Sequence, residues 1–235
     1  MTILSLEKAM RSVNWNENVE FFLQDQELML AIDHSCQRIA IWAKQLENID
    51  SKNPAISFVR AMQICSQHAV TTMGLAIYKA SAASIRGIVE NALYYTYFRT
   101  HHVELASLLR DANYYISKGE ILSFHKLHTP YFSKTQEKLG LLSRIENWYS
   151  AISAIVHGQV PGIWTDQKGI GDTKTNIDTL RMAVKEFCEG ERIVHELFLL
   201  TVGKESWDDF SHTAKKALLA GIPGEQKEIL KLDKH

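Results

Sequence analysis

The sequence predicts an all-α protein, a helical bundle of about seven to nine helices. Six stretches carry apolar residues at spacings of three, four and seven, which is the repeat of one face of an α-helix. The 235 residues include only 12 Gly and 4 Pro, too few for a many-stranded β-protein, which needs frequent turns. Hydrophobic residues make up 46% of the chain, which is enough for a sizeable core.

Charge and cysteine content exclude several classes of protein. Lys plus Arg is 26 and Asp plus Glu is 27, so the chain is neither a polycation of the histone type nor an acidic tail protein. The three cysteines are widely separated and form no CxxC motif, which argues against a disulfide framework and a zinc motif. There is no uninterrupted apolar signal segment and no apolar stretch of membrane-spanning length, so we expect a cytoplasmic protein that does not cross a membrane.

The first half of the chain contains three predicted helices. The first covers residues 18–47, and the polar segment that follows it ends at Pro54. A second helix follows, with an apolar face from Phe58 to Met73. The third, over residues 75–102, begins with many Ala and Ser residues and continues with aromatic residues between 94 and 98. Since small side chains allow two helices to approach closely, we expect this helix in the middle of the bundle.

The second half begins with a short predicted helix near residues 105–115, followed by an ambiguous segment, 117–129, before Pro130. A clear helix over residues 138–157 ends at Gly158, a residue suited to the left-handed turn that terminates helices. Residues 158–173 form a long Gly-rich loop, and long loops in compact domains are often functional. A long helix follows over residues 173–202, then a shorter one over 206–220 with Ser206 as N-cap. The charged tail spans 224–235, and nothing divides residues 1–235 into more than one domain.

Common motifs of nucleotide and metal chemistry are absent. There is no GxxxxGK[ST], HExxH, GxSxG or EF-hand loop, and no ExxH pair of the kind that di-iron bundles repeat on two helices. We therefore expect neither a cofactor nor a metal ion. His125 and His128 have a spacing that would allow metal binding, but no acidic or cysteine pattern accompanies them.

Two polar clusters interrupt apolar helices. Arg86 and Glu90 are four residues apart, and Tyr149, Ser153 and His157 repeat the same spacing further along, so each set shares one helix face. A structural reading is open for both clusters. The Arg–Glu pair would then be an ion pair between helices, and the histidine would simply stand in the last turn before a capping glycine.

Together the two clusters resemble the HEPN superfamily of helical-bundle proteins over about the central third of the chain. Many HEPN proteins are metal-independent endoribonucleases, often toxins or phage-defence effectors, whose active site joins an Arg and a His across a homodimer interface. The resemblance implies RNA cleavage, a homodimer and an antitoxin or other protein partner. The usual family motif has four to six residues between an Arg and a His on one helix, and no pair here has that spacing. The first matching motif, R-x-x-x-E, corresponds to Arg86 and Glu90. The second, Y-x-x-x-S-x-x-x-H-G, corresponds to Tyr149, Ser153, His157 and Gly158.

The resemblance implies different catalytic roles for the two clusters. His157 would transfer the proton of a ribose 2′-OH, because histidine exchanges protons near neutral pH. Arg86, from the neighbouring helix, would bind the phosphate with its planar fork of donors. The products would be a 2′,3′-cyclic phosphate and a 5′-OH, formed without metal. In supporting roles, Glu90 would orient Arg86 or His157, Tyr149 or Ser153 would donate a hydrogen bond to the phosphate, and Trp164 of the loop would stack on a base.

Three alternatives stay open. The main one is a helical adaptor without chemistry, a subunit of a larger complex, which the scattered basic residues and the missing Arg–His spacing favour. A small-molecule-binding regulator is a weaker hypothesis, because no DNA-reading helix-turn-helix is evident. Arg192 and His195 share one helix face and form a second, weaker candidate for the catalytic pair.

Overall fold

The structure is a computed structural model that describes residues 3–160, 162, 164 and 167–230. All regular structure in these residues is helical, and none of it is strand. The prediction of an all-α fold is therefore confirmed. None of the helices in the described part of the chain combines the length and the apolar character needed to cross a membrane.

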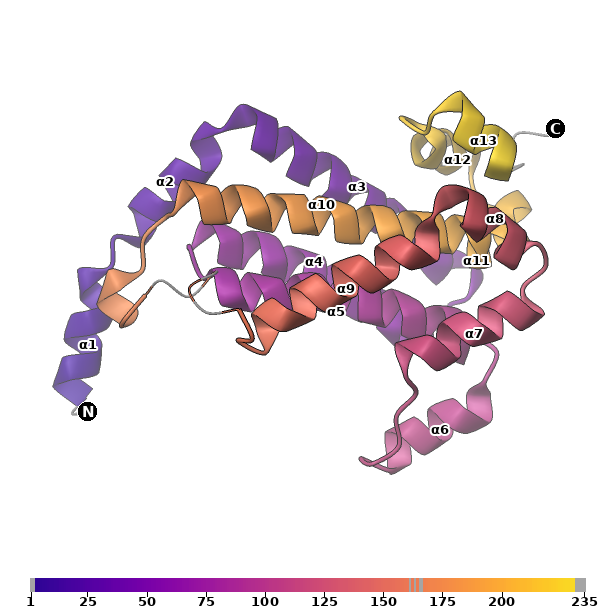
Figure 1. The fold of residues 1–235 in the computed structure, drawn as a ribbon, viewed down its shortest axis with the longest axis horizontal. Helices are drawn as coiled ribbons and strands as arrows, with labels where there is room; N and C mark the ends of the chain where they lie inside the picture. The colour runs from indigo at the N-terminus through magenta and orange to yellow at the C-terminus, as the bar shows by residue number, and fades with distance from the viewer. Residues whose placement is uncertain (1–2, 161, 163, 165–166, 231–235) are drawn as a thin grey trace.

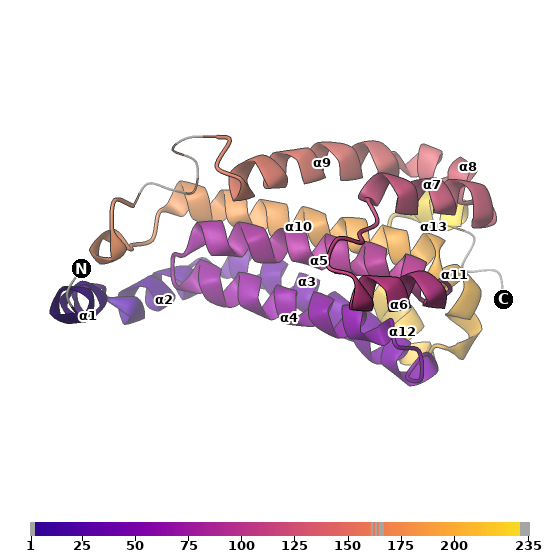
Figure 2. The same cartoon turned by 90° about the horizontal axis from the view of Figure 1, so that it is seen from below.

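Five long helices form the body of the molecule, and they lie side by side along its long axis (Figures 1 and 2). The helix α5 packs against α4, α9 and α10, so the segment expected in the middle of the bundle does lie there. The helix α10 in turn packs on α3 and α9. The five helices are α3 (Gln26–Ile49), α4 (Ile56–Gly74), α5 (Tyr78–Phe98), α9 (Leu141–Val156) and α10 (Ile177–Leu200).

Small residues explain the central place of α5. A Cβ atom added at Gly87 would lie 2.9 Å from Cys65 Sγ of α4, closer than such atoms normally approach. On the same interface the hydroxyl groups of Thr72 and Ser81 are 2.8 Å apart and hydrogen bonded. The Ala- and Ser-rich half of α5 thus allows α4 to pack closely against it.

Shorter helices cover the two ends of this body (Figure 1). At the end near the N-terminus, α1 and α2 extend away from the bundle. At the other end, α6, α7 and α8 lead the chain from α5 to α9, and α11, α12 and α13 follow α10. Their bounds are α1 (Ile3–Ser12), α2 (Trp15–Gln24), α6 (His102–Arg110), α7 (Lys118–His128), α8 (Phe132–Leu139), α11 (Val202–Ser206), α12 (His212–Leu219) and α13 (Gly224–Leu230).

The described residues form more helices than the seven to nine expected, partly because two predicted long helices are broken. The helix expected over 18–47 breaks at Asp25, whose backbone leaves the helical region and whose side chain caps α3 by accepting from the Leu28 N–H. The helix expected over 138–157 starts only at Leu141, because Gly140 before it has a positive φ of 63°. Apolar periodicity continues across such breaks, so the pattern alone does not reveal them.

Other predicted boundaries also need correction. Ser206 is not the N-cap of the late helix; it ends α11, and Ser211 caps α12 by accepting from the Ala214 N–H. The ambiguous segment 117–129 forms α7, and its start is fixed by a capping box between Ser117 and Glu120. Much of the expected charged tail is helix α13, whose Leu230 is buried. Residues 231–235 of that tail lie outside the described residues.

Candidate functional site

The candidate site lies where α9 ends beside α5. The end of α9 is set by Gly158, which has a φ of 68° and so takes the left-handed conformation that glycine adopts without strain. The last turn is closed by hydrogen bonds from the Gly158 N–H to the Ile155 carbonyl and from the Gln159 N–H to the Ala154 carbonyl. His157 therefore caps the helix on the surface, where its side chain is exposed.

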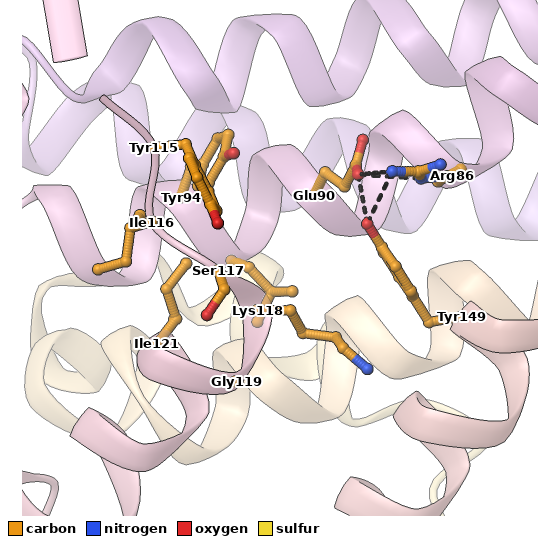
Figure 3. A pocket seen from close by; sticks show the side chains of 11 residues that line it. Arg86, Glu90, Tyr94, Tyr115, Ile116, Ser117, Lys118, Gly119, Ile121 and Tyr149 are labelled. Atoms are coloured by element: carbon orange, nitrogen blue, oxygen red, sulfur yellow. Dashed lines mark hydrogen bonds and ion pairs between the residues drawn. The ribbon is translucent and has the colours of Figure 1, made fainter. Parts of the chain in front are cut away.

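Arg86 of α5 is the centre of a hydrogen-bonded cluster. Its Nη1 lies 3.0 Å from His157 Nε2, and its Nη2 lies 3.0 Å from the Tyr149 hydroxyl. Nε and Nη2 donate to Glu90 Oε1 at 2.9 and 2.8 Å, and the Tyr149 hydroxyl donates to the same oxygen at 2.5 Å. We call these four residues the Arg86 cluster; Figure 3 shows three of them, Arg86, Glu90 and Tyr149. The structure thus joins the two polar clusters that the sequence separates.

The donor and acceptor roles within the cluster follow from its chemistry. A guanidinium group only donates, so Nε2 of His157 must accept the hydrogen bond from Arg86. The imidazole is then neutral and carries its proton on Nδ1. The two amino groups of Arg86 contact different partners, with His157 at Nη1 and Tyr149 at Nη2. A group bound to the guanidinium fork would therefore have His157 on one side and Tyr149 on the other.

Burial and charge fix the protonation of two members of the cluster. Burial, together with the hydrogen bond and charge of Glu90, raises the pKa of Tyr149 to about 12. Burial by itself would lower the pKa of Arg86, but the hydrogen bond and charge of Glu90 outweigh it, and the pKa is raised. Arg86 is thus a permanent cation and Tyr149 keeps its proton at neutral pH.

A cavity of about 390 Å³ opens beside the cluster, between α5, α7 and α9. Arg86, Glu90 and Tyr149 form part of its wall (Figure 3). On the α7 side, the Lys118 ammonium lies 4.8 Å from the centre of the Tyr149 ring and pairs with Glu146. The second cation of the site therefore comes from a helix whose existence the sequence left ambiguous.

Two of the predicted supporting residues do not join the cluster. The Ser153 hydroxyl is inaccessible to solvent and has no hydrogen-bond partner among the described residues. Trp164 is 5% exposed and lines a different cavity, of about 270 Å³, together with Lys79 and Lys174. Parts of the loop expected over 158–173, residues 161, 163, 165 and 166, lie outside the described residues. Its C-terminal part contains a short 3₁₀ turn, Ile170–Asp172.

The weaker catalytic pair, Arg192 and His195, does not form a site. His195 is 2% exposed, and its Nδ1 accepts a hydrogen bond of 2.9 Å from Trp42 Nε1. Burial and the charge of Arg38 lower its pKa to about 3. Arg192 instead lies 3.4 Å from Glu189. His195 is a neutral core residue that no substrate reaches.

The His125 and His128 spacing does not form a metal site either. Both ring nitrogens of His125 are hydrogen bonded to hydroxyl groups, Nδ1 with Thr129 and Nε2 with Thr96, at 2.9 Å each. Burial first, and then the charges of His101 and Arg99, lower its pKa to about 4. In the part of the chain that the structure describes, no three His, Cys, Asp or Glu side chains gather as metal ligands would.

Sequence reasoning missed three residues near the site: Lys79, Tyr115 and Lys118. Lys79 precedes Arg86 by seven residues, two helical turns, so both stand on one face of α5. The seven-residue spacing could therefore have identified Lys79 from the sequence. Tyr115 and Lys118 reach the cavity only because α7 folds back onto α5, and no local pattern encodes that arrangement.

Comparison of the chain with models of protein families, with curated proteins and with solved structures gave no match in any of the three.

Proposed function

We propose that the protein is a metal-independent endoribonuclease of the HEPN type, with Arg86 as phosphate binder and His157 as proton-transfer residue. The observation that carries the proposal is the Arg86 cluster itself. One guanidinium holds a neutral imidazole on Nη1 and a protonated phenol on Nη2. The cluster lies partly exposed beside a cavity, so a substrate has access to it.

Substrate binding would activate His157. A phosphodiester oxygen is a stronger partner for guanidinium than a neutral imidazole, because the hydrogen bond is then between opposite charges. The phosphate replaces His157 on Nη1, and the lone pair of Nε2 becomes free to accept a proton. Glu90 holds Arg86 through Nε and Nη2, so the guanidinium keeps its orientation during the exchange.

The reaction would then use the two groups that flank Arg86, His157 and Tyr149. His157 Nε2 takes the proton of the 2′-OH, and the 2′-oxygen forms a bond to phosphorus. The bond from phosphorus to the 5′-oxygen breaks, and that oxygen receives the proton of Tyr149. Water returns a proton from the imidazolium to the phenolate afterwards. General acid–base transfer of this kind contributes roughly 10²–10⁴-fold to a rate, and Arg86 stabilises the charge on the phosphate oxygens.

The direct test is incubation of the purified protein with total RNA in EDTA. We expect cleavage that persists in the chelator, with fragments that carry 2′,3′-cyclic phosphate and 5′-OH ends. Exposed His68 lies in the middle of α4, and His68→Ala is the matched control that should cleave as wild type does. RNA that stays intact with wild-type protein would contradict the proposal.

A second candidate function is that of an adaptor or subunit of a larger complex. It is favoured by α6, which lies outside the bundle body (Figure 1) and carries Val103 and Leu109 at 82% and 77% exposure. A partner chain packed against α6 would remove these apolar side chains from water. RNA left intact by wild-type protein, together with tight binding of a protein partner, would favour this candidate over the ribonuclease. Light scattering of the purified protein tests whether it pairs with itself, which both candidate functions allow. A homodimer would have twice the chain mass of 26.8 kDa, and Val103→Asp with Leu109→Asp would return it to a monomer if α6 forms the contact.

A further inference from the structure

The cavity beside the Arg86 cluster has the lining of a nucleobase site. Its volume of about 390 Å³ lies at the lower end of small-ligand pockets, which span roughly 300–1,000 Å³. Three phenol rings line it, those of Tyr94, Tyr115 and Tyr149, and aromatic faces stack on bases of any identity. The apolar part of the lining is Leu93, Ile116 and Ile121.

Tyr115 gives the cavity an open aromatic edge. It lies in the connection between α6 and α7, and it is 74% exposed although its ring lines the cavity. In Figure 3, Tyr115 and Tyr94 stand on one side, while Tyr149 and Arg86 stand on the other, with Lys118 below them. A base that enters between these sides meets a ring, while its backbone stays near two cations.

The direction of the RNA strand follows from the order of the groups along α5. Arg86 meets His157 and, one turn later, Glu90 meets Tyr149, so α9 runs antiparallel to α5. The cavity lies on the Tyr149 side of Arg86. In the proposed reaction His157 acts on the 2′-OH of the nucleotide before the phosphate, and Tyr149 acts on the 5′-oxygen of the nucleotide after it.

We infer that the cavity between α5, α7 and α9 binds the base of the nucleotide that follows the cleaved phosphate, in single-stranded RNA. This inference rests on the proposed function, because the direction of the strand depends on the roles of His157 and Tyr149. The substrate is single-stranded because a base inside a duplex is stacked on both faces and cannot enter a pocket unless it is flipped out.

The first experiment places one abasic ribonucleotide on either side of a mapped cleavage position in a single-stranded RNA oligonucleotide. We expect the abasic residue on the 3′ side to reduce cleavage about tenfold, the usual size of one base–aromatic stacking contact. The abasic residue on the 5′ side should leave cleavage within about twofold of the intact RNA, since that base does not enter the cavity. A larger effect on the 5′ side, or equal effects, would overturn the inference.

The second experiment measures binding without cleavage, with fluorescein-labelled single-stranded RNA and its duplex on a His157→Ala background. Adding Tyr115→Ala should weaken single-strand binding about tenfold. Tyr131 is exposed to the same 74% but is not among the residues that line the cavity. Tyr131→Ala is therefore the matched control and should bind as its parent does. The duplex should bind more weakly than the single strand in all three proteins.

The outcomes separate this inference from the proposed function. Cleavage with no effect of Tyr115→Ala or of the 3′ abasic residue overturns the base site and leaves the ribonuclease. Binding that depends on Tyr115 without any cleavage overturns the ribonuclease and the strand direction but supports a base in the cavity. RNA that neither binds nor is cleaved overturns both.

Discussion

Two arginine–histidine pairs in this molecule show how the same residue types come to lie in different environments. Arg192 and His195 are neighbours on α10, yet His195 faces the core and bonds to Trp42. Arg86 and His157 are 71 residues apart, yet their side chains are hydrogen bonded. The difference lies in position on the helix: His195 stands within a long buried helix, whereas His157 stands at an exposed helix end. A shared helix face is therefore a weaker guide to a site than the packing of helix ends.

The largest expected effect is on cleavage by His157→Ala. We expect a loss of about 100-fold or more, the size of a general acid–base contribution, with the helical circular-dichroism spectrum unchanged because the side chain is exposed. Comparison with His195→Gln sharpens the contrast. That variant should lower the melting temperature, because it disturbs the buried partner of Trp42, while the folded protein still cleaves. Loss of cleavage in His195→Gln, together with unchanged cleavage in His157→Ala, would contradict the contrast between the two histidines.

The second prediction concerns the acid stability that the buried histidines produce. The pKa of His125 is lowered to about 4 and that of His195 to about 3, so the unfolded chain binds their protons first, below pH about 6.5. Stability is full above that pH and falls as the pH drops toward the folded pKa values. Between pH 7 and 5 each histidine should remove about 2 kcal/mol of unfolding free energy.

Urea unfolding at the two pH values measures this loss. His125→Gln keeps hydrogen-bonding groups for Thr96 and Thr129 but removes the titration. It should abolish about half of the pH dependence that these two histidines give. The exposed His68→Gln is the control and should retain all of it. An unchanged pH dependence in His125→Gln would mean that the pKa of His125 is the same in the folded and the unfolded protein.

The third prediction is a loss of about tenfold in cleavage for Arg86→Lys, because an ammonium group replaces a two-pronged donor with a point charge. The same change at Arg192 should leave cleavage as it is, since its contact is with Glu189. Steady-state kinetics on one RNA oligonucleotide measures both variants. Equal losses at the two positions would remove the functional distinction between the pairs.

The smallest expected effect is that of Gly158→Ala. Alanine strains at a φ of 68°, and we expect a loss of about 1 kcal/mol of unfolding free energy. The added Cβ has space, because the nearest atom is Lys79 Nζ at 3.7 Å. Urea unfolding checks the value. A loss of several kcal/mol would show that the end of α9 is held by more than its backbone turn.

The sequence by itself determined the helical class, the central place of α5 and the two polar clusters, because these depend on local spacing and side-chain size. Small residues allow two helices to pack closely, and at Gly87 a larger residue would come too close to Cys65 of α4. The end of α9 at Gly158 was also predicted from the sequence, because glycine favours the left-handed backbone conformation that terminates helices.

The resemblance predicted Arg86 and His157 in one site, and their side chains are in contact, but only the tertiary structure decided which atoms and which further residues form that contact. The contact of Arg86 with His157 depends on α9 running antiparallel to α5, and the place of Lys118 depends on α7 folding back to the same surface. The sequence places His157 at a helix end and His195 within a long helix, but only the packing decided that His195 is buried and His157 is exposed. The burial of a side chain and its contacts with distant segments depend on which helices pack against each other. The spacing of apolar residues within one helix specifies which face is apolar but not which helix covers that face.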